Sequence, residues 1–158
     1  MTSTRPTSEA GPVPPSGVIE AGVHHLPLRV YYEDTDAGGI VYHAAYLRFA
    51  ERARTEMLRC LALDHRTLRE RHGLSFAVRR CTIDYRAPAR LDDQLIVATR
   101  LVRQGGASLD LEQQVLSGGR LLVRLDVRLA LLSPGLDVAR LPAELTLALA
   151  PLAAADRA

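Results

Sequence analysis

Residues 121–131 carry the most regular pattern in the chain, and that pattern is typical of an extended strand. Aliphatic side chains occupy every second position, at Leu121, Val123, Leu125, Val127, Leu129 and Leu131, and the charged residues Arg124, Asp126 and Arg128 lie between them. Successive side chains of a strand point to opposite faces, so this period of two predicts one buried and one exposed face. The turn residues Ser133-Pro134-Gly135 then end the strand.

Four more strands are predicted from weaker forms of the same pattern, at residues 26–32, 76–85, 93–103 and 108–116. The glycine pairs Gly105-Gly106 and Gly118-Gly119 mark turns between the late strands, which are therefore expected to form an antiparallel meander. In the second of the four, the apolar positions change from even to odd numbers after Val78. That change of parity predicts a β-bulge near Arg79-Arg80.

The segment 44–61 has apolar residues spaced three and four apart, as in an amphipathic helix. These residues are Tyr46, Ala50, Ala53, Met57 and Leu61, with Leu47, Phe49 and Leu58 beside them. Ala50 and Ala53 are small, so another stretch of backbone can approach the helix closely, as a curved sheet wrapped around it would require. Asp64 is expected to cap a second, short helix that ends at Gly73.

Together these elements predict an α+β fold, in which an antiparallel five-stranded sheet wraps around one long central helix. One such helix cannot cover both faces of the sheet, so we expect the open face or edge to pair with another copy of the chain. Residues 23–142 are assigned to this single domain. Residues 1–22, rich in Pro, Ser, Thr and Gly, are expected to be a disordered tail, and residues 143–158 a C-terminal tail.

Composition and charge exclude several classes of function. Apolar residues are 47% of the chain and charged residues 24%, and the net charge of +2 is too small to indicate a nucleic-acid surface. The sequence has no apolar run long enough for a membrane span and no signal-peptide pattern, so a cytoplasmic protein is expected. Cys60 and Cys81 lack a zinc or redox spacing and are interpreted as buried free thiols.

Residues 31–43, YYEDTDAGGIVYH, concentrate the candidate chemistry between a predicted strand and the long helix. Gly38-Gly39 would let backbone N–H groups turn toward a ligand, and a helix N-terminus offers unpaired N–H donors with a partial positive charge. Such donors suit the oxyanion that develops on a thioester or ester carbonyl. Asp36, upstream of His43, is placed to act as nucleophile or general base.

Each of these residues also has a purely structural interpretation. Asp34 and Asp36 are typical of turn-forming or capping carboxylates, His43 of a core or capping histidine, and the tyrosines of simple packing. A calcium loop of the EF-hand type is excluded because it would need Glu where Ala45 stands, and a P-loop because the Lys is missing. The serines of the late strands lack the sequence context of a serine hydrolase.

A longer resemblance supports the chemical interpretation. The segments that carry it are 31–43, Tyr46, ERARTE at 51–56, IDY at 83–85 and APARLDD at 87–93. They resemble the YbgC-type acyl-CoA thioesterases, in the 4-hydroxybenzoyl-CoA thioesterase branch of the hotdog-fold superfamily. The resemblance extends from about Leu28 to Pro142. It implies a hotdog fold, with active sites at the subunit interfaces of a homodimer or homotetramer.

The resemblance also implies roles for individual residues. Asp36 matches the family's catalytic carboxylate, which attacks the thioester carbonyl or activates water. The backbone N–H of His43 would polarise the carbonyl, its imidazole could assist a proton transfer, and Tyr32 could position Asp36. Gly39 belongs to the glycine pair expected to turn its N–H groups toward the substrate. The loop from Arg103 to Ser108 matches a region that contacts the CoA part of the substrate in relatives.

The expected substrate is an acyl-CoA, and no metal or redox cofactor is required. The alternative is a binding or scaffold protein with little turnover, associated with acyl carrier protein or with the Tol-Pal envelope system. A hotdog dehydratase would need a different arrangement of acid and histidine on the helix. Ala45 stands where many members of the wider family have Asn, so a change in local hydrogen bonding without loss of activity is expected.

Overall fold

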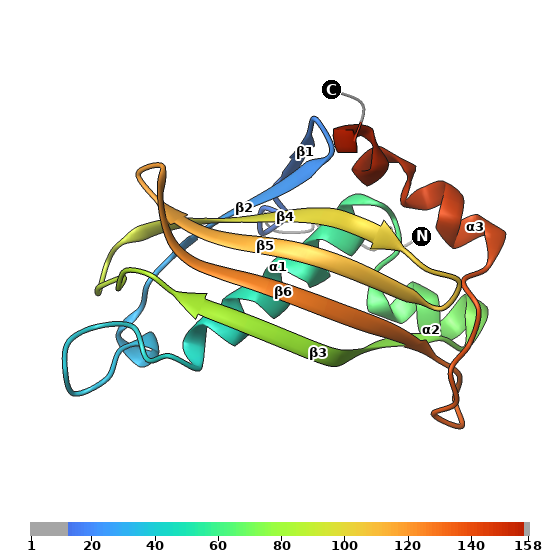
Figure 1. The fold of residues 1–158 in the computed structure, drawn as a ribbon, viewed down its shortest axis with the longest axis horizontal. Coiled ribbons are helices and arrows are strands. Elements are labelled where there is room, and N and C mark those ends of the chain that lie inside the picture. Colours follow the sequence, from blue (N-terminus) through green and yellow to red (C-terminus); the bar gives the residue numbers. More distant parts are fainter. Residues whose placement is uncertain (1–12, 157–158) are drawn as a thin grey trace, which may run out of the picture.

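The computed structural model describes residues 13–156, whose strands form a single six-stranded antiparallel sheet (Figure 1). The strands are β1 (Val18–Glu20), β2 (Val23–Arg29), β3 (Ser75–Tyr85), β4 (Gln94–Gln104), β5 (Ser108–Ser117) and β6 (Arg120–Leu132). Their order across the sheet is β1-β2-β4-β5-β6-β3. The helices are α1 (Ala45–Cys60), α2 (His65–His72) and α3 (Ala143–Ala148), with 3-10 helices η1 (Tyr32–Asp34) and η2 (Ala150–Asp156).

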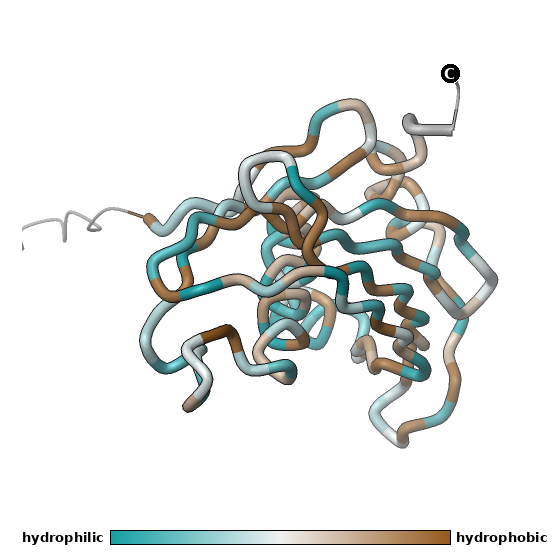
Figure 2. Tube along the Cα trace, turned by 60° about the vertical axis from the view of Figure 1, so that its left-hand side comes forward, coloured by the Kyte–Doolittle hydropathy of each residue, from teal (hydrophilic) through white to brown (hydrophobic). Residues whose placement is uncertain are grey.

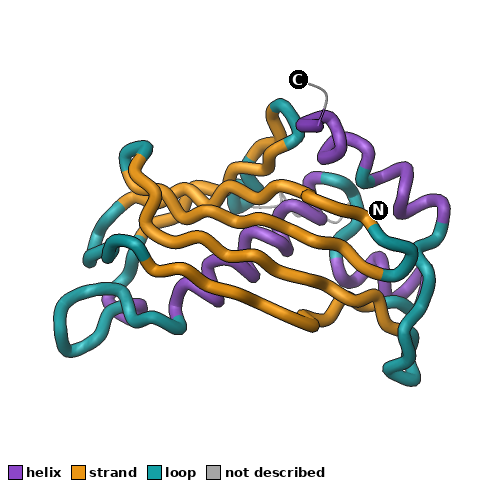
Figure 3. Tube along the Cα trace, in the orientation of Figure 1, coloured by secondary structure: helices purple, strands orange, loops and turns teal. Residues whose placement is uncertain are grey.

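One long helix, α1, lies against one face of the sheet, and the strands curve around it (Figure 3). This is the α+β hotdog arrangement that the sequence predicts, and β4, β5 and β6 form the expected meander. The sheet has six strands where five were predicted. The additional strand is β1, which is short and pairs with β2 at the edge.

Small residues bring α1 close to the sheet. Ala45, Ala50 and Ala53 are completely buried, and Phe49 and Met57 fill the space on either side of them. Figure 2 shows hydrophobic and hydrophilic residues alternating along the strands, as the period of two requires. Five of the six apolar positions predicted for β6 are buried in the core that faces α1, and the sixth, Leu121 at the beginning of the strand, is only partly buried.

A polar side chain, Gln113 of β5, is also buried under α1. Its Nε2 donates to the Ala50 carbonyl (3.0 Å) and to Thr99 Oγ1 (2.9 Å), and its Oε1 accepts from Arg54 Nη1 (2.8 Å). A buried amide without partners would cost about 1–3 kcal/mol, so these hydrogen bonds are needed for the close contact to be stable. They also fix the position of α1 along the strands.

Two local features of the sequence prediction are confirmed. The register between β3 and β6 shifts between Val78 and Arg80, where the bulge was expected. Asp64 caps α2, because its carboxylate accepts from the Thr67 backbone N–H (3.0 Å) and hydroxyl (2.9 Å). Gly73 ends α2 in the left-handed conformation, with φ of +65°.

The ends of the described chain are more ordered than the sequence predicts. β1 lies inside the range 1–22 that was expected to be disordered, and the Ser16 carbonyl there accepts a hydrogen bond from the His24 ring (2.7 Å). Residues 1–12 lie outside the described residues. Residues 143–156, expected to be a tail, form α3 and η2. Leu145 of α3, Leu149 between the two helices and Leu152 of η2 are buried in the core. Pairing and packing with distant parts of the chain order both segments.

One expectation for the cysteines is wrong. Both are free, but Cys60 is exposed and Cys81 is only partly buried. Cys60 is the last residue of α1, and its Sγ lies 3.4 Å from the Ser16 carbonyl. Separately, none of the helices within residues 13–156 combines the length and the apolar character needed to cross a lipid bilayer.

We predict that His24 makes the stability of the protein depend on pH. Its ring is fully buried, and burial lowers its pKa, assisted by the neighbouring His25, against the raising effects of the Ser16 hydrogen bond and Glu56. The unfolded chain therefore takes up this proton first as the pH falls below about 6.5. Stability is retained above that pH and is lost below it, which melting temperatures between pH 8 and pH 5 would measure.

The substitution His24→Gln should reduce this acid-side loss, because glutamine keeps a donor for Ser16 but does not titrate. The exposed residue His43 provides the matched control. The stability of His43→Gln should depend on pH in the same way as that of the wild type. An identical acid-side slope in the wild type and in His24→Gln would contradict the prediction.

Candidate active site

The segment between η1 and α1 is a closed loop held by its own backbone. Thr35 and Val41 form a β-bridge, the Asp36 N–H donates to the Ile40 carbonyl (2.9 Å), and the Gly39 N–H donates to the Asp36 carbonyl (3.0 Å). Gly39 has φ of +79°, a left-handed conformation that glycine adopts without strain. The loop is joined to the rest of the domain where the Val41 N–H donates to the Ala89 carbonyl (2.9 Å).

Asp34 shapes the loop, as expected from the sequence. Its side chain is only 7% exposed, and its Oδ2 accepts from the Tyr31 backbone N–H (2.8 Å). The Asp34 carbonyl accepts from the Tyr42 N–H (2.8 Å), which ties the beginning of the loop to its end. A carboxylate with these contacts is a structural group and is not available to a ligand.

Asp36, in contrast, is exposed, and its carboxylate is only partly engaged. Oδ1 accepts from the Gly38 backbone N–H (2.8 Å), while Oδ2 has no hydrogen-bond partner among residues 13–156. A Cβ at position 38 would lie 3.1 Å from Oδ1, so glycine allows this close approach. The loop thus fixes the direction of the carboxylate and leaves one oxygen free to react.

His43 lies just before α1 and not at its first residue. The helix begins at Ala45, with Ala44 as the N-cap, so the expected start at residue 44 is one residue early. Within the described part of the chain, the His43 backbone N–H has no hydrogen-bond partner. The preceding carbonyl, of Tyr42, accepts from the Ala45 N–H (2.8 Å), which orients the peptide unit that carries this free donor.

Asp36 and His43 line the same cavity, of about 400 Å³. Its other lining residues are Ile40, Val41, Tyr46, Tyr85, Arg86, Ala87 and Pro88. The wall is mostly apolar, and its polar groups come from the loop, the two tyrosines and Arg86. A partly unpaired carboxylate, a free amide and an apolar wall therefore meet in one place, an arrangement that suits a ligand with a polar head and an apolar body.

Two tyrosines, Tyr46 and Tyr85, form part of this wall, although the sequence indicated only packing for Tyr46 and gave Tyr85 no site role. Their rings are 5.8 Å apart, with planes inclined at 66°. The Tyr46 hydroxyl accepts from the Ala89 N–H (3.0 Å), and burial raises its pKa. The Tyr85 hydroxyl donates to the His43 carbonyl (2.9 Å). Tyr85 comes from β3, about 40 residues along the chain, so only the fold brings it to the loop.

Not every predicted site residue lies in the cavity. Gly39 is in the turn and Tyr32 is 83% exposed, and neither lines the cavity. No hydrogen bond joins the Tyr32 side chain to Asp36 within residues 13–156. Arg103 and Ser108 lie at the β4–β5 turn, at the opposite end of the sheet from the Asp36 loop (Figure 1). The length of β4 separates the two ends, roughly 30 Å from the rise of a strand.

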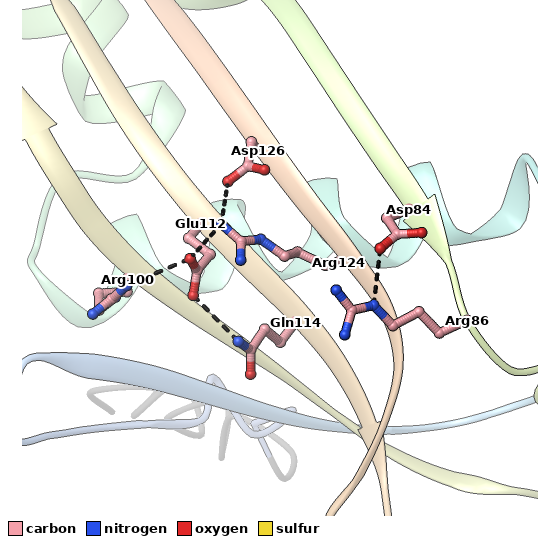
Figure 4. A network of polar contacts seen from close by, with 7 residues as sticks. All are labelled: Asp84, Arg86, Arg100, Glu112, Gln114, Arg124 and Asp126. Atoms are coloured by element: carbon pink, nitrogen blue, oxygen red, sulfur yellow. Dashed lines mark hydrogen bonds and ion pairs between the residues drawn. The ribbon is translucent and has the colours of Figure 1, made fainter.

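Arg86, at the edge of the cavity, is paired with a carboxylate. Its Nε lies 2.8 Å from Asp84 Oδ2 (Figure 4). Neighbouring charges on the sheet face opposite α1 are paired as well, since Glu112 contacts Arg124 (3.0 Å) and Arg100 (3.4 Å). The edge of the cavity is therefore not strongly basic. Residues 13–156 contain no group of three or more His, Cys, Asp or Glu side chains arranged to hold a metal ion.

Comparison with known proteins places this geometry in a family. The sequence pattern of the thioesterase-like superfamily matches residues 30–149. The acyl-CoA thioesterase YbgC of Haemophilus influenzae is 48% identical over 110 residues, which cover 70% of this chain and 81% of that protein. The chain belongs to the YbgC-type thioesterases of this superfamily.

Other relatives agree with this assignment. The YbgC acyl-CoA thioester hydrolase of Escherichia coli O157:H7 is 48% identical over 97 residues, covering 61% of this chain and 72% of that protein. A solved structure of a probable thioesterase from Bartonella henselae is 39% identical and superimposes with a TM-score of 0.73, covering 76% of this chain and 99% of that one. This YbgC-type thioesterase therefore has both the sequence and the fold of its family.

We predict that Asp34→Ala destabilises the protein by about 1–3 kcal/mol, because the Tyr31 N–H loses its buried acceptor. Denaturant unfolding of the purified variant would measure the change. The neighbouring residue Glu33 is exposed, so Glu33→Ala is the matched control and should unfold like the wild type. Equal stability of the two variants would contradict the structural role of Asp34.

Proposed function

We propose that this protein hydrolyses acyl-CoA thioesters to a free acid and CoA, in the cavity between the Asp36 loop and α1. The observation that carries the proposal is that Asp36, with one free carboxylate oxygen, shares a cavity with the unpaired His43 amide. The printed names of relatives from Haemophilus influenzae and Escherichia coli describe acyl-CoA thioester hydrolysis. The apolar wall suits the acyl group of such a substrate.

In the proposed mechanism, the thioester carbonyl oxygen accepts a hydrogen bond from the His43 backbone N–H. Asp36 Oδ2 then attacks the carbonyl carbon, or removes a proton from a water molecule that attacks it. The carbon–sulfur bond breaks, and the CoA thiolate takes up a proton. If Asp36 attacks directly, water hydrolyses the resulting anhydride and restores the carboxylate. The His43 imidazole is proposed to supply or accept the proton, and Tyr32 to position Asp36 when substrate is bound.

Substrate binding is proposed to involve Gly39, through its loop, and Arg103 and Ser108, toward the CoA portion. Within one protomer, Arg103 and Ser108 are too far from Asp36 to share a ligand with it directly. A second copy resolves this problem. Across the sheet, Ser108 pairs with Ala130 and Ala130 with Ala77, so Ser108 lies level with the beginning of β3. Tyr85, which lines the cavity, is at the other end of β3. An antiparallel pair of β3 strands would bring these opposite ends together.

The proposed assembly is therefore a homodimer, or a homotetramer built from such dimers, formed through the edge strand β3. Among the described strands, β3 pairs only with β6, so its other edge has unpaired N–H and C=O groups along eleven residues. An exposed edge of this length is unusual unless another strand covers it. Val78 on this strand is half exposed, which is also consistent with a covered edge. A cytoplasmic location stays a prediction.

We predict that Asp36→Asn lowers kcat for acyl-CoA hydrolysis by about 10²–10⁴-fold, because the amide can neither attack nor remove a proton. Release of free CoA thiol, followed across acyl chains of different length, would measure turnover. Glu33→Gln changes a neighbouring exposed carboxylate and should keep wild-type kcat. Turnover that survives in Asp36→Asn would exclude Asp36 as the catalytic carboxylate. No turnover by the wild type, with saturable binding of acyl carrier protein, would favour the scaffold function.

If Asp36 of one protomer and Arg103 of the other form one site, mixed oligomers of two variants provide a second test. Asp36→Asn and Arg103→Glu should each be defective alone, the first in kcat and the second in KM. In a dimer with sites shared between protomers, a refolded one-to-one mixture regains about a quarter of the wild-type sites, since one site of each mixed dimer is intact. Steady-state activity of the mixture would measure this recovery. Activity equal to the average of the separate variants would contradict the shared site.

A further inference from the structure

Tyr85 joins β3 to the beginning of α1 at the proposed reaction site. It is the last residue of β3, and its hydroxyl donates to the His43 carbonyl (2.9 Å). Its ring packs against Tyr46, which is itself held by a hydrogen bond from the Ala89 N–H. Tyr85 therefore contacts the residue that carries the free amide, and it does so from a rigid strand.

The bulge in β3 is what directs Tyr85 toward the site. Before the bulge, even-numbered residues such as Phe76 and Val78 face α1, where they line a small cavity beside the helix. In a regular strand the even-numbered side chains would continue to face α1, and Tyr85 would point to the opposite face. The register shift between Val78 and Arg80 reverses this order, so Tyr85 faces α1 instead.

The hydrogen bond from Tyr85 acts on a part of the backbone that the helix does not hold. His43 precedes the N-cap, so its carbonyl belongs to no helical hydrogen bond. The peptide unit before His43 is fixed by the Ala45 N–H donating to the Tyr42 carbonyl (2.8 Å). The peptide unit after His43 is fixed by Tyr85. Both torsions of His43 are therefore constrained, and with them the direction of its unpaired N–H.

We propose that Tyr85 is a positioning residue. By holding the His43 carbonyl, its hydroxyl restricts the backbone of His43 so that the His43 N–H points at the thioester carbonyl oxygen. This inference rests on the proposed acyl-CoA hydrolysis and adds to it a group that does not touch the reacting atoms. Preorganised donors stabilise an oxyanion because they need no reorientation during the reaction. Burial also raises the pKa of Tyr85, so its hydroxyl remains protonated and donating throughout an ordinary assay range.

The test is Tyr85→Phe, which removes the hydroxyl and keeps the ring against Tyr46. We expect kcat to fall about 10-fold, less than the 10²–10³-fold typical for deleting an oxyanion donor, because the His43 N–H remains but is less well oriented. KM should stay within about twofold of the wild type. Binding of an acyl-CoA thioether, which has no carbonyl at the reacting position, should also be unchanged, since the donor interacts only with that carbonyl.

The matched control is Tyr31→Phe, which removes the hydroxyl of a nearby exposed tyrosine outside the cavity and should keep wild-type kcat. Amide hydrogen exchange gives a second measurement that does not depend on activity. Exchange of the Tyr42 and Ala45 N–H groups, which are hydrogen-bonded in the wild type, should be faster in Tyr85→Phe, while exchange in β6 should be unchanged. A local effect of this kind separates positioning from a general loss of structure.

Several results would overturn the inference. Wild-type kcat in Tyr85→Phe would show that the hydroxyl does not contribute. A Tyr85→Phe variant that loses thioether affinity and melting temperature together with kcat would show that Tyr85 acts through packing alone. A wild-type protein without turnover would overturn the proposed function and this inference with it. An active wild type with an equally active Tyr85→Phe variant would overturn only the role of Tyr85.

Discussion

The close contact between α1 and the concave face of the sheet is the constraint on which the rest of the structure depends. Ala45, Ala50 and Ala53 are completely buried, so the helix backbone can lie near the strands. Gln113 satisfies its polar groups in this layer by bonding to the Ala50 carbonyl and to Thr99. A larger residue at Ala50 or Ala53 would separate the helix from the sheet and leave the Gln113 amide without its hydrogen-bond partners. Packing and hydrogen bonding therefore specify the same arrangement.

The position of α1 in turn decides where the groups of the proposed site lie. The loop before it returns to the domain through the Val41–Ala89 hydrogen bond, and Asp34 closes it onto Tyr42. These contacts place the Asp36 carboxylate opposite the first residues of the helix. The bulge in β3 then brings Tyr85 to the His43 carbonyl from the sheet side. Helix, loop and strand each restrict a different torsion of the same short segment.

The open edge of β3 underlies the proposed dimer, in which each protomer would contain only part of the site. The cavity near Tyr85 and the β4–β5 turn near Ser108 lie at opposite ends of the sheet (Figure 1). In the proposed dimer, antiparallel pairing of two β3 strands would bring the cavity of one protomer next to the β4–β5 turn of the other. Covering an unpaired edge and completing a binding site would then be achieved by the same interface, and both follow from the direction of one strand.

Local patterns in the sequence were enough to determine the type of each main element. Alternation predicted β6, the change of parity predicted the bulge, and Asp64 and Gly73 predicted both ends of α2, because each signal depends on neighbouring residues. The loop with Asp36 and His43 was also evident from its residues. Only the tertiary structure decided the packing of β1, α3 and η2 and the contacts of Tyr85. Both depend on interactions between residues far apart in the chain, which no local pattern encodes.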